Sequence, residues 1–527
     1  MQSLEKNKLL LFPFFMGIIL MAYSWYSSYP LSIDSVDDFV FNHVSVLYWF
    51  SLPLMLTSMC MLAVTSKSHI SKWIIVVGIV MTIYSLSYFY YMLPSSDSHY
   101  FRGLTEYFMR TKNLDPSQPN HRYFQWPSFF VLADVATSVS GLELANLQFL
   151  LFAIIGFLLA TTLHVYASKI FKGGGFLAVV AFFIGMYYSL NYQCVPFSLA
   201  LGLLFILFML ETRQKSVSVI LTMLVLFMSI SITHAFVPLF FVIYLLIRCI
   251  LNRSKQYGRL FLLTLIIYLV VQVTQAQFLF ADNIRIVITL SSEYARTVEA
   301  TLAPITVPID VIAQMFSRTV TVTNVMICVA GFIFLLIKRK MRDLDKAIFL
   351  TGIVYSVSGT VFYTLGSRAI PIAFVPISLG ALYIYESKFR PYLICLFLIL
   401  LSLFAFVPLH TSFTYLPYMF QTKEAYTTAN FMIEKYDWNR YSTILADAGP
   451  KWYISPQVEG NSIIETDISL NFSSSNIETY ECMIYSVGLG KSLLRYNVSE
   501  EETSRVILDR FNVIYHSGFS YIAEKDR

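Results

Sequence analysis

Over its first 410 residues the chain alternates long apolar runs with short polar segments. A helix needs about 20 apolar residues to cross a hydrocarbon layer of about 30 Å, because unpaired backbone polar groups are not tolerated in lipid. About thirteen runs approach this length. They lie at 9–28, 44–65, 73–93, 146–166, 174–192, 196–210, 217–232, 235–250, 260–280, 320–337, 347–365, 369–385 and 392–410. The pattern therefore predicts an all-α polytopic membrane protein over residues 1–410.

The first run, 9–28, lacks the pattern of a signal peptide. Only Lys6 and Lys8 precede it as basic residues, and no small-residue cleavage site follows it. A secretory signal peptide carries such a site directly after its apolar region. We therefore expect 9–28 to be a retained helix.

The distribution of lysine and arginine predicts which loops face the cytoplasm, because cytoplasmic loops accumulate these residues. They are concentrated in alternate loops, for example 248–259 and 338–346, whereas the loops of the other side before residue 411 hold fewer than half as many. The N-terminus is therefore predicted to be cytoplasmic and the C-terminus outside. Three larger loops, 29–43, 94–127 and 281–319, are then extracytoplasmic.

Composition agrees with this assignment. Hydrophobic residues make up 57% of the 527 residues and charged residues only 13%, and the mean hydropathy is +0.63, which excludes an ordinary soluble globular protein. The net charge of +5 mostly reflects the loop bias, and no concentrated basic face indicates nucleic-acid binding. The six cysteines are dispersed and form no CxxC pair, so we expect neither a disulfide framework nor structural zinc.

Beyond residue 410 charged residues return and the long apolar runs end. The stretches Thr443–Asp447, Cys482–Ser486 and Arg505–Tyr515 read as short strands and a helix. A segment of about 110 residues is long enough to bury its own core. We therefore predict that 411–527 is a separate small α/β domain on the extracytoplasmic side.

The polar stretch 94–127 is the richest in candidate chemistry. Acids, bases and aromatic rings stand there between two apolar segments, namely Asp97, His99, Arg102, Glu106, His121, Tyr123 and Trp126. A carboxylate at a membrane interface becomes a general base when partial desolvation raises its pKa towards the working pH. Asp97 stands in the position for this role, so the stretch is interpreted as an active-site loop.

The order of features in this stretch resembles a known family. Asp97-Ser-His99, a helical Tyr100–Arg110 segment, a Pro-rich connector, Tyr123-Phe-Gln-Trp-Pro127 and an apolar stretch ending Ser140-Gly141-Leu142 are similar to the first extracytoplasmic loop of GT-C fold glycosyltransferases. Protein mannosyltransferases and lipid A aminoarabinose transferases belong to that superfamily. The resemblance implies a GT-C-like fold, a sugar donor carried on a polyprenyl phosphate, and Asp97 as the catalytic residue.

Further features fit the same resemblance. The pair Tyr192-Gln193 before Pro196, the Thr233-His234 junction and Gly366-Ser-Arg368 are similar to polar positions at the outer helix ends of family members. The resemblance implies substrate-binding roles for Tyr192, Gln193, His234 and Arg368, with Arg318 added from loop 281–319. A guanidinium suits a lipid phosphate because it donates two parallel hydrogen bonds.

The chain also departs from the family pattern. Two extra helices and a loop with Asp34, Asp37 and Asp38 precede the candidate catalytic loop, whereas the family often places that loop after its first helix. Asp37 or Asp38 is therefore an alternative catalytic base. The Trp-Trp-Asp-Tyr-Gly element of oligosaccharyltransferases is absent from the sequence, so transfer of a single sugar is expected.

Each candidate has a structural alternative. Asp97 can cap a helix that starts at Ser98. The near-helical spacing of His99, Arg102 and Glu106 also fits one solvated face with local ion pairs. The rings of 121–126 also fit an interfacial aromatic belt. His234 can have a structural role as a hydrogen-bonded residue, and the Arg368 side chain can snorkel to the interface. Loop 281–319 can lie on the membrane as an amphipathic cover.

The sequence therefore predicts a membrane glycosyltransferase, hexosyl or pentosyl, of a prokaryotic plasma membrane. Its expected partners are a polyprenyl-phosphate-linked sugar and an extracytoplasmic glycan, lipid or protein hydroxyl, with inversion at the anomeric carbon. No cofactor is required; a divalent Mg or Mn ion held by Asp97 with Asp37 or Asp38 is an alternative. The rival functions are a transporter or flippase for lipid-linked sugars and a non-catalytic subunit of glycan assembly.

Overall fold

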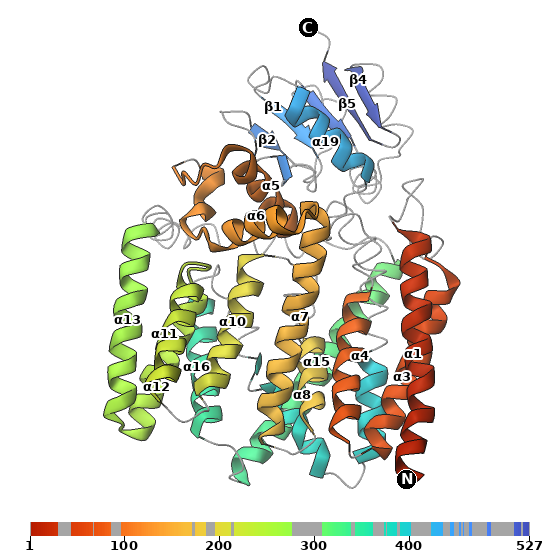
Figure 1. Ribbon diagram of the computed structural model, residues 1–527, viewed down its shortest axis with the longest axis vertical. Helices are drawn as coiled ribbons and strands as arrows, with labels where there is room; N and C mark the ends of the chain where they lie inside the picture. Colours follow the sequence, from red (N-terminus) through yellow and green to blue (C-terminus); the bar gives the residue numbers. More distant parts are fainter. Residues whose placement is uncertain are drawn as a thin grey trace.

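The computed structural model describes most of the helical region and selected segments beyond it. The described residues are 2–29, 44–66, 68–85, 96–117, 119–170, 174–185, 195–211, 216–276, 308–338, 343–361, 374–375, 377–386, 390–401, 423–435, 443–446, 453–454, 457, 463–465, 482–485, 511–517 and 520–525. Figure 1 draws these residues as coloured ribbons.

Helices that run roughly along one direction form the body of the molecule (Figure 1). They are α1 (Gln2–Ser28), α3 (Val46–Thr65), α4 (His69–Tyr84), α7 (Leu144–Ser168), α8 (Gly175–Gly185), α10 (Pro196–Glu211), α11 (Val217–Ser231), α12 (Val237–Asn252), α13 (Lys255–Gln275), α15 (Pro308–Ile337) and α16 (Asp343–Val361). A 3-10 helix, η3 (Leu379–Glu386), packs against α15 and α8.

Four of the described helices are both long and apolar enough to cross a membrane. They are Leu10–Ser28, Val46–Thr65, Leu144–Ser168 and Lys255–Gln275. Shorter apolar helices of 10–17 residues, among them α4, α8, α10, α11 and α12, accompany them. The chain is therefore a helical integral membrane protein, as the hydrophobic pattern predicts, whereas the total of thirteen spans stays a prediction.

Serine residues fix where several of these helices begin. The Ser45 hydroxyl accepts a hydrogen bond from the Leu47 N–H before α3, and the Ser68 hydroxyl accepts one from the Ile70 N–H before α4. The first N–H groups of a helix lack partners within it, and a capping serine supplies one at a gain of about 1 kcal/mol. The polar residues between these apolar runs thus also start α3 and α4.

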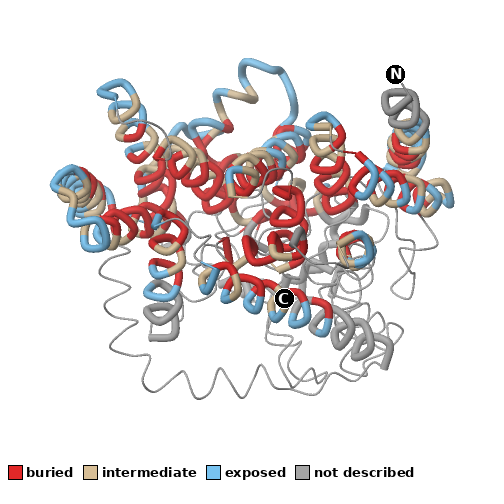
Figure 2. Tube along the Cα trace, turned by 90° about the horizontal axis from the view of Figure 1, so that it is seen from below, coloured by how far each residue is buried: buried red, intermediate tan, exposed pale blue. Residues whose placement is uncertain are grey.

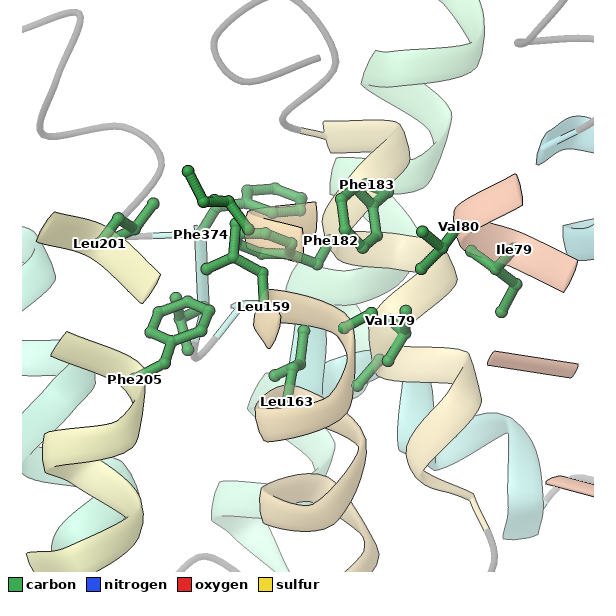
Figure 3. Close-up of a cluster of buried hydrophobic side chains, with 14 of the residues drawn as sticks. Ile79, Val80, Leu159, Leu163, Val179, Phe182, Phe183, Leu201, Phe205 and Phe374 are labelled. Carbon is green, nitrogen blue, oxygen red and sulfur yellow. The ribbon is translucent and has the colours of Figure 1, made fainter. Parts of the chain in front are cut away.

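Helix α8 lies at the centre of the bundle. All its residues from Gly175 to Ile184 are buried, which agrees with a sequence that is apolar on every side. The ring centroids of Phe182 on α8 and Phe205 on α10 lie 5.8 Å apart. Figure 3 shows this part of the core, where side chains from α7, α8 and α10 converge, and Figure 2 shows buried residues in the middle of the bundle with exposed residues on its outer sides.

A second layer covers one end of the bundle. It consists of α5 (Ser96–Thr111), η2 (Pro119–Gln125) and α6 (Ser128–Ser140), which lie across the helix ends (Figure 1). Helix α6 ends at Gly141, whose φ of 68° is left-handed and whose N–H bonds the Thr137 carbonyl. We call α5, η2 and α6 the outer layer. The N-terminus lies at the opposite end of the bundle (Figure 1).

A mixed β-sheet from the C-terminal region stands beyond the outer layer (Figure 1). Its strands are β1 (Thr443–Ala446), β2 (Ile463–Glu465), β3 (Cys482–Tyr485), β4 (Phe511–Ser517) and β5 (Ser520–Lys525), in the order β2-β1-β3-β5-β4. Strand β1 is parallel to β2 and β3, whereas β5 is antiparallel to β3 and β4. Helix α19 (Lys423–Lys435) packs on β4 and β5. Strands β1 and β3 lie in two of the stretches that read as short elements, and the third stretch ends in β4; the independence of 411–527 as a domain stays a prediction.

The expected span at 369–385 differs from the structure in the type of helix that it forms. Its second part forms the 3-10 helix η3, which crosses α15 where two glycines meet. A Cβ built on Gly380 would lie 1.7 Å from the carbonyl oxygen of Cys328, and one on Gly331 would lie 2.2 Å from the Gly380 carbonyl oxygen. Small residues let helix backbones approach closely inside a membrane. Hydropathy marks the apolar run and carries no information on this contact.

Replacement of Gly380 by alanine tests the contact. The added methyl group meets backbone atoms that cannot rotate away, so Gly380→Ala should destabilise the protein by about 1–3 kcal/mol, as overpacking does. The melting temperature of the purified protein in detergent measures this. The matched control is Gly258→Ala in α13, whose Cβ would lie 3.3 Å from the Cys249 sulfur and gains helix propensity. Equal melting temperatures for the two variants would contradict the close contact.

Candidate active site in the outer layer

Helix α5 carries the acid that the sequence predicts as catalytic. The helix begins at Ser96 rather than at Ser98, so Asp97 lies inside its first turn and not before it. A carboxylate in the first turn is favoured by the positive end of the helix dipole, typically by about 0.3–1 kcal/mol. The structure describes the backbone of Asp97 and not its side chain. The position of the residue on the helix is therefore defined.

Aromatic contacts hold α5 against the rest of the outer layer. The ring of Tyr123 in η2 lies edge-on to Phe101, with centroids 4.8 Å apart, and 5.9 Å from the ring of Tyr100. Such edge-to-face pairs are each worth about 0.5–1.5 kcal/mol beyond the area they bury. His99 is fully buried on the same helix. The bundle-facing side of α5 is thus a packed surface.

The histidine of η2 is enclosed within the layer. His121 is buried, with its ring centroid 4.3 Å from that of Tyr107 and 5.3 Å from that of Phe124. Trp126 is buried as well, while Tyr123 is half-buried. A belt of interfacial aromatics faces lipid and headgroups. His121 and Trp126 instead pack inside the protein.

The outer layer is anchored on the turn between α11 and α12. The Ser128 N–H donates to the carbonyl of Ile232 at 3.4 Å, and the Thr233 hydroxyl lies 3.1 Å from the Ser128 hydroxyl. The Trp126 side chain forms a small apolar cluster with Ala235. Residues about 100 positions apart in sequence therefore meet here, and the layer that contains Asp97 is brought to the turn that contains His234.

His234 is held in one orientation. Its Nδ1 accepts a hydrogen bond from the backbone N–H of Phe236 at 3.2 Å, and its ring lies edge-on to Phe197 with centroids 5.4 Å apart. Because Nδ1 is the acceptor, the proton of the neutral ring sits on Nε2. His234 is buried. The residue thus presents a donor at a defined ring atom.

Two neighbouring side chains bury polar atoms that have no partner among the described residues. These atoms are both amide atoms of Gln125, which is 3% exposed, and the indole nitrogen of Trp126. A buried polar group without a hydrogen bond costs about 1–3 kcal/mol, so native proteins retain few of them. Such atoms mark a place where a polar ligand or ordered water makes the missing bonds. Gln125 and Trp126 are therefore suited to binding a polar substrate beside His234.

The opposite side of α5 bears a charged pair. Arg102 Nε donates to Glu106 Oε1 at 2.9 Å, and the guanidinium lies 4.1 Å from the ring centre of Tyr426 in α19. The hydroxyls of Tyr426 and Tyr453 both donate to the Glu106 carboxylate, the first at 3.0 Å. The pair is present as the helical spacing predicts, but Arg102 is only 3% exposed and is not on a solvated face.

Burial and charge set the protonation states around this pair. Burial alone would lower the pKa of Arg102, but the charge of Glu106, together with Tyr426 and Tyr453, more than offsets it and raises that pKa above its usual value. Burial also raises the pKa of Tyr453 well above its usual value, and the Glu106 charge adds to the effect. Both groups therefore remain proton donors across the physiological range.

The predicted site residues divide into three groups. The structure brings together His99, Arg102, Glu106, His121, Tyr123, Trp126 and His234 within or beside the outer layer. Asp97 and Arg318 are placed by their backbones in α5 and α15. Asp37, Asp38, Tyr192, Gln193 and Arg368 lie outside the described residues.

Sequence reasoning missed the contributions of Gln125, Tyr426 and Tyr453. Gln125 stands inside the run Tyr123–Pro127, and a polar residue between aromatic neighbours was a usable signal. The two tyrosines lie more than 300 residues beyond α5, and no local pattern connects them with it.

A metal site is not evident in the part of the chain that the structure describes. No group of three or more His, Cys, Asp or Glu side chains gathers there. The predicted alternative of a divalent ion depends on Asp97, Asp37 and Asp38, whose side chains are outside that part. It stays a prediction.

Comparisons with known proteins give one coarse likeness. No protein-family model matches the chain, and no curated protein matches it by sequence. Among solved structures, it is similar to the crystal structure of ArnT from Cupriavidus metallidurans in the apo state, at 10% identity over 86% of this chain and 98% of that one, with a TM-score of 0.49. At this TM-score the function must be inferred from the site itself.

The partnerless amide of Gln125 leads to a paired prediction. Gln125→Met removes buried polar atoms and should raise the free energy of unfolding by about 1–2 kcal/mol, yet abolish binding of substrate hydroxyls. Ser58→Ala is the matched control, since the Ser58 hydroxyl in α3 is also buried without a partner among the described residues and is remote from the outer layer. Both variants should melt at a higher temperature, and only Gln125→Met should lose transfer. Full activity of a stabilised Gln125→Met would refute the binding role.

Proposed function

We propose that the protein is an integral membrane glycosyltransferase that moves one sugar from a polyprenyl phosphate to an acceptor hydroxyl at the outer face of the membrane. The observation that carries this proposal is the position of Asp97 in the first turn of α5, on a layer that packs onto the turn of His234. The resemblance of the 97–142 stretch to GT-C glycosyltransferases supports the same assignment of Asp97. The site thus combines a candidate base with buried hydrogen-bonding groups at the end of an apolar bundle.

The reaction balances as a direct displacement. The Asp97 carboxylate takes the proton of the acceptor hydroxyl while its oxygen forms a bond to the anomeric carbon. The bond between that carbon and the phosphate oxygen breaks, and the polyprenyl phosphate leaves with the electron pair from the opposite face. The configuration at the anomeric carbon is therefore inverted. A phosphate is already a good leaving group, so positioning and charge stabilisation supply much of the rate.

The remaining residues bind and orient. Gln125 and the indole N–H of Trp126 hydrogen-bond sugar hydroxyls. His234, next to Ala235 that packs on Trp126, carries the proton of its neutral ring on Nε2. Arg368 is proposed as a cationic partner of the lipid phosphate on the resemblance of its sequence position. Arg318 is proposed for the same role as a basic residue of the stretch 281–319. The donor arrives along the membrane because its isoprenoid chain remains in lipid.

A transporter is the alternative function. Transporters place polar residues near the bilayer midplane, where the solute crosses. The described bundle does bury charged groups, namely the Arg248–Glu211 pair at 3.4 Å and Asp345, which accepts from the Tyr166 hydroxyl. Glu211 is the last residue of α10 and Asp345 is in the first turn of α16, so both lie at helix ends. The buried charges of the described bundle thus lie away from its middle, which disfavours transport.

The test replaces the candidate base. Purified protein in nanodiscs is supplied with undecaprenyl-phosphate glucose, mannose or arabinose, each radiolabelled in the sugar, and with native membrane extract as the acceptor. Asp97→Asn should reduce transfer about 10²–10⁴-fold, the usual contribution of a general base.

The matched control is Asp134→Asn on α6. Among the described residues Asp134 pairs with the largely exposed Lys112 at 2.8 Å, and such pairs contribute at most about 1 kcal/mol to stability. The control should transfer sugar like the parent protein. If Asp97→Asn is as active as Asp134→Asn, the assignment of Asp97 is wrong; movement of intact donor across the bilayer without transfer would favour the flippase.

A further inference from the structure

Four side chains from three segments form a buried contact between α5 and the C-terminal region. They are Arg102 and Glu106 of α5, Tyr426 of α19 and Tyr453 of a short turn before β2. We call this set the α5 clamp. Glu106 is at its centre, because its carboxylate accepts from Arg102 Nε and from both tyrosine hydroxyls.

Each partner in the α5 clamp depends on the others. The Arg102 guanidinium is almost fully buried, and a buried cation is costly unless it is paired and hydrogen-bonded. Arg102 pairs with the Glu106 carboxylate and with the face of the Tyr426 ring. The Tyr453 hydroxyl also lies 2.7 Å from the side-chain amide oxygen of Asn430 in α19. Removal of Glu106 would therefore leave Arg102 buried without a counter-charge among the described residues. The contact is specific, because removal of one partner leaves the buried polar groups of the others unsatisfied.

A second contact extends this attachment along the helix. The Arg110 guanidinium, in the last turn of α5, donates to the backbone carbonyl of Gln457 at 3.4 Å. The C-terminal region thus holds α5 at two points on its outer side, while Phe101 and Tyr123 hold it on the bundle side. An isolated helix of 16 residues is marginal in water. Tertiary contacts therefore determine where α5 lies.

Asp97 is rigidly connected to the α5 clamp. Glu106 lies nine positions further along α5, which corresponds to about 13 Å along a helix. A tilt of α5 about its bundle contacts would move the first turn by an ångström or more, and such a displacement at a reacting group costs about 10²-fold in rate.

We propose that Glu106, with Tyr426 and Tyr453, is a positioning residue by which the C-terminal region sets the location of Asp97 over the bundle. The proposal rests on the proposed function of Asp97. It assigns the C-terminal region a part in the transfer site, through contacts that do not touch the substrate.

The geometric arm of the test does not depend on activity. The six native cysteines are first replaced, and spin labels are then attached at Ser96→Cys on α5 and Val217→Cys on α11. Double electron–electron resonance in nanodiscs gives the distribution of the distance between the two labels. The parent protein should give one narrow distribution. Glu106→Gln and Tyr453→Phe should each broaden or shift it. The matched controls are Glu434→Gln at an exposed position of α19 and Tyr392→Phe, where Tyr392 is 76% exposed. Neither control should change the distance distribution.

The kinetic arm separates positioning from a structural role. With an undecaprenyl-phosphate sugar as donor, Tyr453→Phe and Glu106→Gln should lower kcat by about 10- to 100-fold and change KM less than about 2-fold. The double variant should be no worse than Glu106→Gln alone, because both changes break the same contact. Tyr453→Phe is the milder change and keeps the test valid if Glu106→Gln fails to fold.

Three outcomes would overturn the proposal. The first is that neither the distance distribution nor kcat changes, and the second is that the distribution broadens while kcat stays the same. The third is that kcat falls while the distribution stays the same, which would make Glu106 a direct substrate contact. Failure of the proposed function is recognised separately, by an active Asp97→Asn in the same assay.

Discussion

The cost of placing an unpaired polar group in hydrocarbon is the constraint on which the whole structure depends. It forces the backbone of the spanning region into helices and removes charge from the middle of the bundle. The charged groups that the described part of the bundle buries, Asp345 and the Glu211–Arg248 pair, lie towards helix ends and are bonded to tyrosine or to each other. Chemistry that needs acids and bases is thus confined to the ends of the helices, and the outer layer provides the richest such surface.

The outer layer has contacts with the bundle on one side and with the C-terminal region on the other. Below, Trp126 and Ser128 attach it to the turn of His234; above, Glu106 attaches it to Tyr426 and Tyr453. Because α5 has such contacts on two sides, its position is defined although it is not part of a spanning helix. This arrangement fixes the backbone of Asp97 at the end of the bundle, outside the helices that form its body (Figure 1).

Sequence reasoning predicted what depends on local pattern. Apolar runs gave helices such as α7 and α13, and the spacing of Arg102 and Glu106 gave their ion pair. It did not predict the 3-10 form of η3, because the close approach of Gly380 to α15 is a contact between distant segments. It also missed the tyrosines of the α5 clamp, since the contact joins residues more than 300 positions apart. Hydropathy finds the spans, and long-range packing decides which polar residues meet.

The most direct measurement of the central claim is a cryo-electron microscopy structure of the protein in nanodiscs with undecaprenyl phosphate. The account predicts phosphate density in the outer layer, between the first turn of α5 and the His234 turn, with the Gln125 side chain directed towards the bound ligand. Phosphate density at the other end of the bundle, near Arg248, with an empty outer layer would contradict it.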